Sequence, residues 1–242
     1  MTKITSSCST HHGPAFPDGL RLLYMQQTTM NRNTSPGFFS YYSKIFYRPG
    51  EAFRELSTEP KLLRYAYAAV TISAVLYTFV YIFLIMGHGL PFKPWLRIEP
   101  EVYYRYNVFF CAPSMFLAWI LSAAVMHLKC RALTGAGSFE QMLGLAAFGV
   151  SVASWATGVH DLITSFLGGM HIINQNEYEE MMNSPTIWRI LLWIQMLLYA
   201  FLFVFFFSRA MRTIYDLKWW QCISFGLGGF IVYQGFFFIF NR

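Results

Sequence analysis

The residues best suited to chemistry in this sequence are the adjacent pair His160 and Asp161, which follow a long apolar run. An ionisable side chain near the centre of a membrane-spanning helix costs about 2.5–3.5 kcal/mol, so its presence there indicates a function by default. Asp161 could bind a cation or pass on a proton. The alternative is that the pair lies near the outer end of its helix, where water reaches both side chains.

Two further histidines, His88 and His171, are expected in loops at the same end of the protein as this pair. Imidazole and carboxylate groups together can bind zinc, which makes an intramembrane metal enzyme a third and weaker hypothesis. The spacing fits neither HExxH nor His-x3-His, and the sequence has no Walker loop, GxSxG motif or paired-cysteine site. We therefore predict no catalytic residue, no metal and no cofactor, and a protein that is not an enzyme.

The helix that positions His160 and Asp161 is predicted to begin at Ser138 and to end near residue 166. Ser138 and Gln141 have capping-box spacing, in which each side chain binds the other residue's backbone N–H group. Gly135 and Gly137 would make the preceding turn flexible.

Glu140 would lie in the first turn of this helix, where the helix dipole stabilises a negative charge by about 0.3–1 kcal/mol. The alternative role for Glu140 is a contact with Lys129 or Arg131 that orders the turn.

Small residues form a stripe along the same helix. The stripe has spacings of four, three and four, and Asp161 extends it by a further three positions; its members are Ala147, Ser151, Ser154 and Gly158. In lipid, small side chains let neighbouring helices approach closely, so this helix is predicted to be the centre of a membrane bundle. Gln195 and Gln234 lie within other apolar runs and are expected to form hydrogen bonds between helices.

Composition supports a membrane protein independently of any motif. The 242 residues are 55% hydrophobic and only 12% charged, whereas about 25% charged residues are usual in a soluble domain. We predict an all-α, polytopic membrane helix bundle with five transmembrane helices and a short N-terminal interfacial helix. The expected spans are residues 65–86, 108–128, 138–166, 188–207 and 219–240, and the segments 87–106 and 170–186 are expected to be loops.

Three parts are expected along the chain. Residues 1–36 are polar and rich in Ser, Thr and Asn, which predicts a disordered leader. Residues 37–64 mix aromatic and basic side chains, which is typical of an amphipathic segment lying in the head-group layer; a docking surface for a cytoplasmic partner is the alternative. Residues 65–242 form the five-span membrane domain.

The distribution of basic residues predicts the orientation of the protein in the membrane. Most Lys and Arg residues after residue 30 lie before the first span or in the connections after the second and fourth spans. Basic residues accumulate on the cytoplasmic side, so we expect a cytoplasmic N-terminus and a C-terminus on the opposite side. The net charge of +6 thus reflects membrane flanks, and we predict no nucleic-acid partner.

Several features together resemble a known family. Pro49 and residues 53–56 lie in the interfacial segment, Glu59 and Pro60 precede the first span, and residues 135–143 open the third span. With five spans and a cytoplasmic N-terminus, this arrangement is similar to the YIP family of Ypt/Rab-GTPase-interacting membrane proteins, especially its prokaryotic-type members. The resemblance covers roughly residues 45–240.

The resemblance implies a five-span membrane domain and, for the eukaryotic branch, a role in membrane traffic through Rab GTPases. This sequence lacks that branch's long leader and its Asp-Leu-Tyr-Gly-Pro-type motif, so a Rab-type GTPase is doubtful as a partner. We expect a non-catalytic scaffold, or a role in membrane organisation or trafficking. The expected partners are the lipid bilayer and a second copy or another membrane protein. The alternative is a small-solute or ion transporter or channel component that uses His160 and Asp161.

Overall fold

The computed structural model of this chain describes residues 36–91 and 96–241, without the side chain of residue 241. The segment predicted to be disordered lies almost entirely outside the described residues, so that expectation stays a prediction. Residues from Phe38 onward belong to one compact unit.

Helices are the regular elements of the described ranges. They are α2 (Phe38–Tyr47), α3 (Pro49–Leu56), α4 (Leu62–Met86), α5 (Pro100–Thr134), α6 (Phe139–Gly169), α7 (Gln175–Asn183), α8 (Ile187–Tyr215) and α9 (Trp219–Asn241). In this part of the chain, five helices, namely α4, α5, α6, α8 and α9, are long and apolar enough to cross a membrane. The predicted all-α class with five spans is confirmed.

The connections hold more helix than the sequence analysis predicted. The loop expected over residues 87–106 is shorter, because α5 already begins at Pro100 with Glu101 in its first turn. Proline suits the first position of a helix, where its missing N–H group costs nothing. The loop expected over residues 170–186 contains α7. Asn174 caps this helix, because its Oδ1 accepts hydrogen bonds from the backbone N–H groups of Asn176 and Glu177 at 3.1 and 3.4 Å. The predicted short helix before the first span is confirmed as α3, and a second short helix, α2, precedes it.

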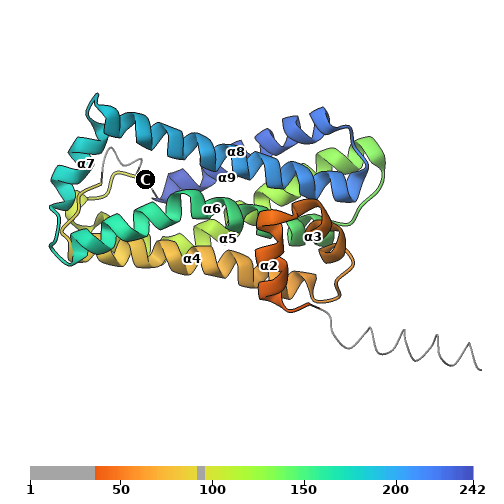
Figure 1. The fold of residues 1–242 in the computed structure, drawn as a ribbon, viewed down its shortest axis with the longest axis horizontal. Helices are drawn as coiled ribbons and strands as arrows, with labels where there is room; N and C mark the ends of the chain where they lie inside the picture. Colours follow the sequence, from red (N-terminus) through yellow and green to blue (C-terminus); the bar gives the residue numbers. More distant parts are fainter. Residues whose placement is uncertain (1–35, 92–95, 242) are drawn as a thin grey trace, which may run out of the picture. The chain divides into compact units, whose positions relative to one another are not determined.

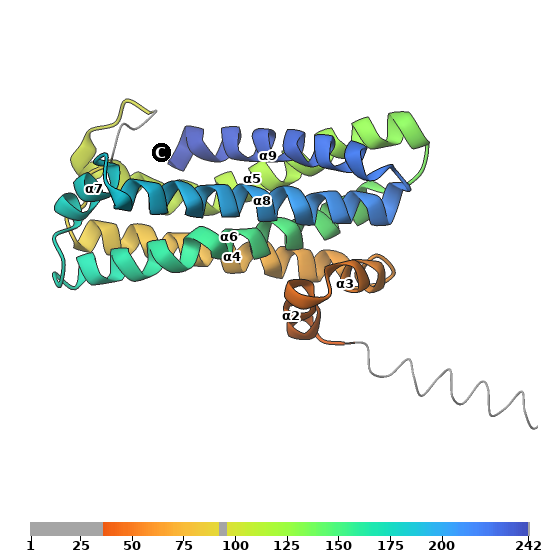
Figure 2. The ribbon, with the colours of Figure 1, turned by 45° about the horizontal axis from the view of Figure 1, so that its top comes forward.

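The third span, α6, lies at the centre of the bundle, as predicted. It packs against α4, α5 and α8, and α9 packs against α5 and α8 (Figure 2). In its most apolar stretch 83% of α6 is buried, compared with 22% for α8. Small side chains explain this central position, because they let three neighbours approach one helix axis.

The two ends of the bundle differ in what they carry (Figure 1). One end holds α2, α3 and the 135–138 turn between α5 and α6; we call it the turn end. The other end holds α7 and the last described residues of the chain, and we call it the α7 end. An odd number of crossings places the start and the finish of the bundle at opposite ends in this way.

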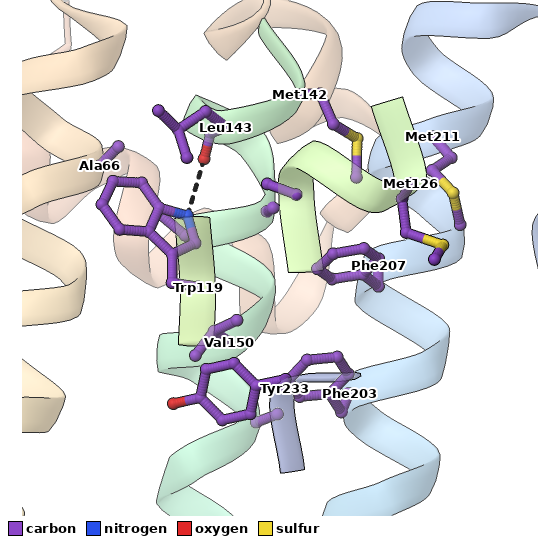
Figure 3. Packing of buried hydrophobic residues seen from close by; sticks show 14 of the residues in the cluster. Ala66, Trp119, Met126, Met142, Leu143, Val150, Phe203, Phe207, Met211 and Tyr233 are labelled. Carbon is purple, nitrogen blue, oxygen red and sulfur yellow. Dashed lines mark hydrogen bonds between the residues drawn. The ribbon is translucent and has the colours of Figure 1, made fainter. Parts of the chain in front are cut away.

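The main core cluster joins α4, α5, α6, α8 and α9 (Figure 3). Trp119 of α5 is fully buried, and its indole Nε1 donates a hydrogen bond to the backbone oxygen of Leu143 in α6, 3.0 Å away. Met126 of α5 and Phe207 of α8 both lie against Gly229 of α9, and Phe203 of α8 belongs to the same cluster. An indole can be buried in this way only where its N–H group finds an acceptor.

Candidate functional site

The turn between α5 and α6 has the predicted chemistry. Gly135 ends α5 with φ of 67°, and Gly137 has φ of 82°, both in the left-handed region that favours glycine. Ser138 Oγ accepts a hydrogen bond from the backbone N–H of Gln141 at 3.1 Å, and Gln141 Oε1 accepts one from the backbone N–H of Ser138 at 3.4 Å. The predicted capping box is confirmed.

This turn is also fixed to its surroundings. Gln141 Nε2 donates a hydrogen bond to the backbone oxygen of Ser57, just after α3, at 3.2 Å. A Cβ atom at Gly137 would overlap the ring of Tyr215 in α8. The hydroxyl of Tyr215 is in turn hydrogen-bonded to His127 Nδ1 at 2.6 Å. Gly137 is therefore required both for its backbone conformation and for the approach of α8.

Glu140 lies exposed in the first turn of α6. No ion pair of Glu140 with Lys129 or Arg131 occurs among the residues that the structure describes. A stabilising interaction with the helix dipole therefore remains the interpretation of this residue.

Ser151 is the centre of a buried polar cluster that joins three helices. Its Oγ donates a hydrogen bond to the backbone oxygen of Ala69 in α4 at 2.7 Å and accepts one from Ser73 Oγ at 2.9 Å. The hydroxyl of Tyr42 in α2 lies 2.8 Å from the same oxygen and accepts a hydrogen bond from Trp155 Nε1 at 2.7 Å. Ser151 thus attaches the interfacial helix α2 to the interior of the bundle.

The other members of the stripe have different roles. Ser154 Oγ donates to the backbone oxygen of Val150 in its own helix at 2.8 Å, so it makes no hydrogen bond to another helix in the described chain. Gly158 contacts α4, because a Cβ atom there would overlap the side chain of Leu76. The stripe therefore combines one polar joint at Ser151 with close packing at Gly158.

His160 and Asp161 lie near the α7 end and contact each other and α7. His160 Nδ1 is 3.1 Å from Asp161 Oδ1, and about a third of each side chain is exposed, 32% and 36% respectively. His160 Nε2 is 2.7 Å from the hydroxyl of Tyr178 in α7. Burial, together with the nearby charges of Glu179 and Asp161, raises the pKa of Tyr178 to about 12, so this hydroxyl keeps its proton at neutral pH.

Asp161 lines two cavities. The deeper one, of about 200 Å³, extends between all five long helices as far as Ser154, the central residue of α6. The other, of about 230 Å³, opens beneath α7 and is also lined by His160 and Glu179. The two cavities share part of their walls, formed by Tyr77, Tyr81, Asp161 and Leu192. Asp161 thus lies where a polar path from the α7 end would enter the bundle.

The deeper cavity is lined by polar groups that already have partners. The hydroxyl of Tyr77 is 2.6 Å from Thr157 Oγ1. Gln195 Nε2 donates to the backbone oxygen of Thr157 at 3.4 Å, and the hydroxyl of Tyr199 donates to Gln234 Oε1 at 3.1 Å. The hydrogen bonds between helices predicted for Gln195 and Gln234 are confirmed.

The residues considered for a metal site form two pairs, His88 with His171 and His160 with Asp161. The imidazole rings of His88 and His171 stack with their centroids 6.1 Å apart. In the described residues, no group of three or more His, Cys, Asp or Glu side chains is arranged to hold a metal ion. The described cysteines Cys111, Cys130 and Cys222 are buried and unpaired, and Cys8 lies outside the described residues.

Sequence reasoning missed Tyr42, Tyr178 and Glu179 as neighbours of the candidate residues. Tyr178 and Glu179 approach Asp161 because α7 folds back over the end of α6, and Asn174, a favourable helix cap, is the signal that predicts α7. No local signal links Tyr42 to Ser151, because the two residues lie on helices that are distant in sequence.

Five apolar helices around a small-residue centre define a multi-pass helical membrane protein. The profile of the Yip1 domain matches residues 43–241, so the chain belongs to the Yip1 domain family. The family predicted from sequence is confirmed, while the prokaryotic-type assignment stays a prediction. No curated protein and no solved structure is matched.

Proposed function

We propose that this Yip1-family protein is a non-catalytic scaffold that acts in membrane organisation or trafficking, with its N-terminus in the cytoplasm and its C-terminus on the opposite side. The excess of Lys and Arg on the segments at the turn end supports this orientation. The observation that carries the proposed function is the way in which α2 and α3, here called the platform, are held on the bundle.

One face of the platform is fixed to the bundle. Ile45, Phe53 and Leu56 are fully buried in a cluster that includes residues of α4, α6 and α8. Lys44 Nζ lies 2.7 Å from a carboxylate oxygen of Glu55 and 3.1 Å from one of Glu51, which joins α2 to α3. A hydrogen bond to Glu55 raises the pKa of Lys44, so the amine stays charged across the physiological range.

The opposite face of the platform leaves large aromatic side chains uncovered. Phe39 is 78%, Phe46 54% and Tyr47 67% exposed. These aromatic side chains are suited to contact lipid head groups and a protein partner. The platform already holds their backbone in place, so little conformational entropy is lost on binding. The partner is a second copy of this chain or another membrane protein.

Affinity purification of the full chain from mild detergent tests this proposal. The intact protein should retain a stoichiometric protein partner or a second copy of itself, and the double substitution Phe46→Ala and Tyr47→Ala should remove it. Phe109→Ala is the matched control, because Phe109 is an equally exposed aromatic residue on α5, at 76%. A monomer without any partner would overturn the scaffold proposal.

A second candidate function is transport of a cation or small polar solute. The observation that favours it is the position of Asp161 in the walls of both cavities. Intramembrane carboxylates that line water-accessible cavities mark ion and proton paths in many transporters.

Flux into proteoliposomes, measured with protons, Na⁺ and K⁺ in turn, tests this candidate. Asp161→Asn should abolish the flux, whereas Asp216→Asn should leave it unchanged. Asp216 is exposed after α8 in a left-handed backbone conformation that asparagine also adopts readily. The absence of flux for all three cations, or flux that survives Asp161→Asn, would remove transport of these ions from consideration.

A further inference from the structure

Arg209 and Arg212 form a cluster with aromatic rings at the turn end. The guanidinium carbon of Arg209 lies 5.1 Å from the ring centre of Trp219 and 5.6 Å from that of Phe205. Arg212, three residues further along α8, places its guanidinium carbon 5.7 Å from the same Trp219 ring. The indole of Trp219 is thus shared by two cations, both held near the connection between α8 and α9.

Neither arginine has a carboxylate partner among the described residues. The Nε atom of Arg209 is fully buried and has no hydrogen-bond partner there. The nearby acidic residues of α3, Glu51 and Glu55, bind Lys44 instead. Nε is part of the charged guanidinium group, and leaving this buried donor without an acceptor is unfavourable, so an anionic ligand at this place would be stabilising.

Helix length and residue types favour a position for the cluster at the depth of lipid head groups. With 29 residues, α8 is longer than the roughly 20 residues that cross the hydrocarbon core, and the charges of Arg209 and Arg212 favour its last turns as the part outside the core. Trp219 opens α9, and tryptophan at a span end is typical of the membrane–water interface. Gly50 of α3 lies beside the cluster, because a Cβ atom there would be 3.6 Å from Arg209 Nη1.

We propose that Arg209, Arg212 and Trp219 form a binding site for the phosphate group of an anionic phospholipid at the turn end. A planar guanidinium donates two parallel hydrogen bonds to phosphate oxygens, and the rings of Phe205 and Trp219 hold Arg209 in place before the ligand arrives. The inference does not depend on the scaffold or transport proposals, because the same residues reach the head groups in either orientation of the protein.

Native mass spectrometry of the full chain from nanodiscs tests this site. Nanodiscs of phosphatidylglycerol and phosphatidylcholine in equal amounts should yield protein that retains phosphatidylglycerol selectively. Arg209→Gln and Arg212→Gln should each lower the retained phosphatidylglycerol by about fivefold, the effect of roughly one interfacial arginine. Arg131→Gln is the matched control, an exposed arginine at the same end without an aromatic partner in the described contacts.

Arg212→Gln and one further variant, Arg209→Lys, separate the site from folding and from general surface charge. Arg212 is exposed, so Arg212→Gln should fold even if Arg209→Gln does not. Arg209→Lys keeps the charge but loses the planar fork, so it should retain less phosphatidylglycerol than the intact protein and more than Arg209→Gln. Equal retention by Arg209→Lys and the intact protein would show that charge alone suffices and would overturn the proposed role of the guanidinium group.

The source of the phosphate is decided by a parallel measurement in detergent. Soluble phosphatidylglycerol should raise the Tm of the intact protein, while millimolar inorganic phosphate should not. Stabilisation by inorganic phosphate alone would overturn the assignment to a lipid. Equal retention of the two lipids, or an equal loss in Arg131→Gln and Arg212→Gln, would overturn the site as a whole.

Discussion

The two halves of α6 differ in how far neighbouring helices bury them. Every residue from Met142 to Ser154 is buried, whereas buried, half-buried and exposed residues alternate from Trp155 to Gly169. The first half is closed by α4, α5 and α8 and is held by the Ser151 cluster. The second half borders two cavities and carries the ionisable pair His160 and Asp161.

The first half of α6 thus contributes mainly to stability, whereas the second half carries the groups that could bind a ligand. In the closed half, small side chains are needed because neighbouring helices occupy the space, and each hydroxyl is consumed by a hydrogen bond. In the open half, polar groups line free volume that a ligand could fill. Substitutions in the closed half should therefore change stability, while those of the cavity-lining residues in the open half should change mainly the response to pH and to ligands.

The largest expected effect is that of Gly144→Ala in the closed half. A Cβ atom at Gly144 would overlap the branched end of the Leu62 side chain, which is itself buried. We expect a loss of about 1–3 kcal/mol in the free energy of unfolding, as for other overpacked sites. Thermal unfolding in detergent, followed by tryptophan fluorescence, measures it.

The control for Gly144→Ala is Gly235→Ala, because nothing lies within 4 Å of a Cβ atom at Gly235. That substitution should be neutral or stabilise α9 by up to about 1 kcal/mol through helix propensity. Equal Tm values for the two variants would show that the closed half has spare room.

A smaller effect is expected for Ser151→Ala. The substitution removes the donor to Ala69 and leaves the buried hydroxyls of Tyr42 and Ser73 short of a partner. The expected loss is about 1–2 kcal/mol. Hydrogen exchange by mass spectrometry should show faster exchange in α2, because this helix loses its polar link to α6.

Ser154→Ala serves as the comparison for Ser151→Ala. The Ser154 hydroxyl bonds only within its own helix among the described contacts, so the loss should be below about 0.5 kcal/mol. If both serine variants unfold alike, the position of Ser151 between three helices carries no special weight.

The smallest effect is expected beside the open half, for Glu179→Gln in α7, which lines a cavity together with Asp161. Burial raises the pKa of Glu179 above its ordinary value of 4.5, the charge of Asp161 raises it further, and Gln175 and His160 oppose the shift. The folded protein thus binds the proton of Glu179 more tightly than the unfolded chain does. The stability that this proton contributes is lost as the pH rises through the folded pKa. Glu179→Gln should therefore raise the Tm at pH 7 by about 1–2 °C.

The same experiment at several pH values sharpens the comparison between the two halves. The decline in Tm between pH 4.5 and neutrality that stems from Glu179 should be absent in Glu179→Gln. It should persist in Glu180→Gln, because Glu180 is exposed on the same helix. A steeper decline in Glu179→Gln than in the intact protein would contradict the assigned direction of the shift.

Local patterns in the sequence predict the elements and the turn well. Ser138 and Gln141 form the expected capping box, and the small-residue stripe correctly predicts that α6 is central, because both depend on spacing within one helix. The family and the five spans follow from the same kind of local evidence. Pro100 and Asn174 mark the starts of helices in segments that we predict to be loops, although each residue is favourable at a helix N-terminus.

The surroundings of the candidate residues could not be predicted in the same way. Ser151 forms hydrogen bonds with Tyr42 and Ser73. These contacts depend on how α2 and α4 are rotated against α6, which no spacing within one helix determines. The two cavities beside Asp161 depend likewise on gaps between bulky side chains of several helices. The sequence predicts only a basic connection after the fourth span, because the contact of Arg209 with Trp219 requires the bend between α8 and α9.

The hydrogen bond between Tyr42 and Ser151 joins positions that are 109 residues apart. During translation the ribosome completes α2 long before it makes Ser151. Tyr42 therefore has no hydrogen bond to Ser151 while α4 and α5 are inserted into the membrane. The platform can dock only after α6 is in place. Docking of α2 and α3 is thus a late step in biogenesis, and the platform offers its completed surface only on a bundle whose third crossing has already been inserted.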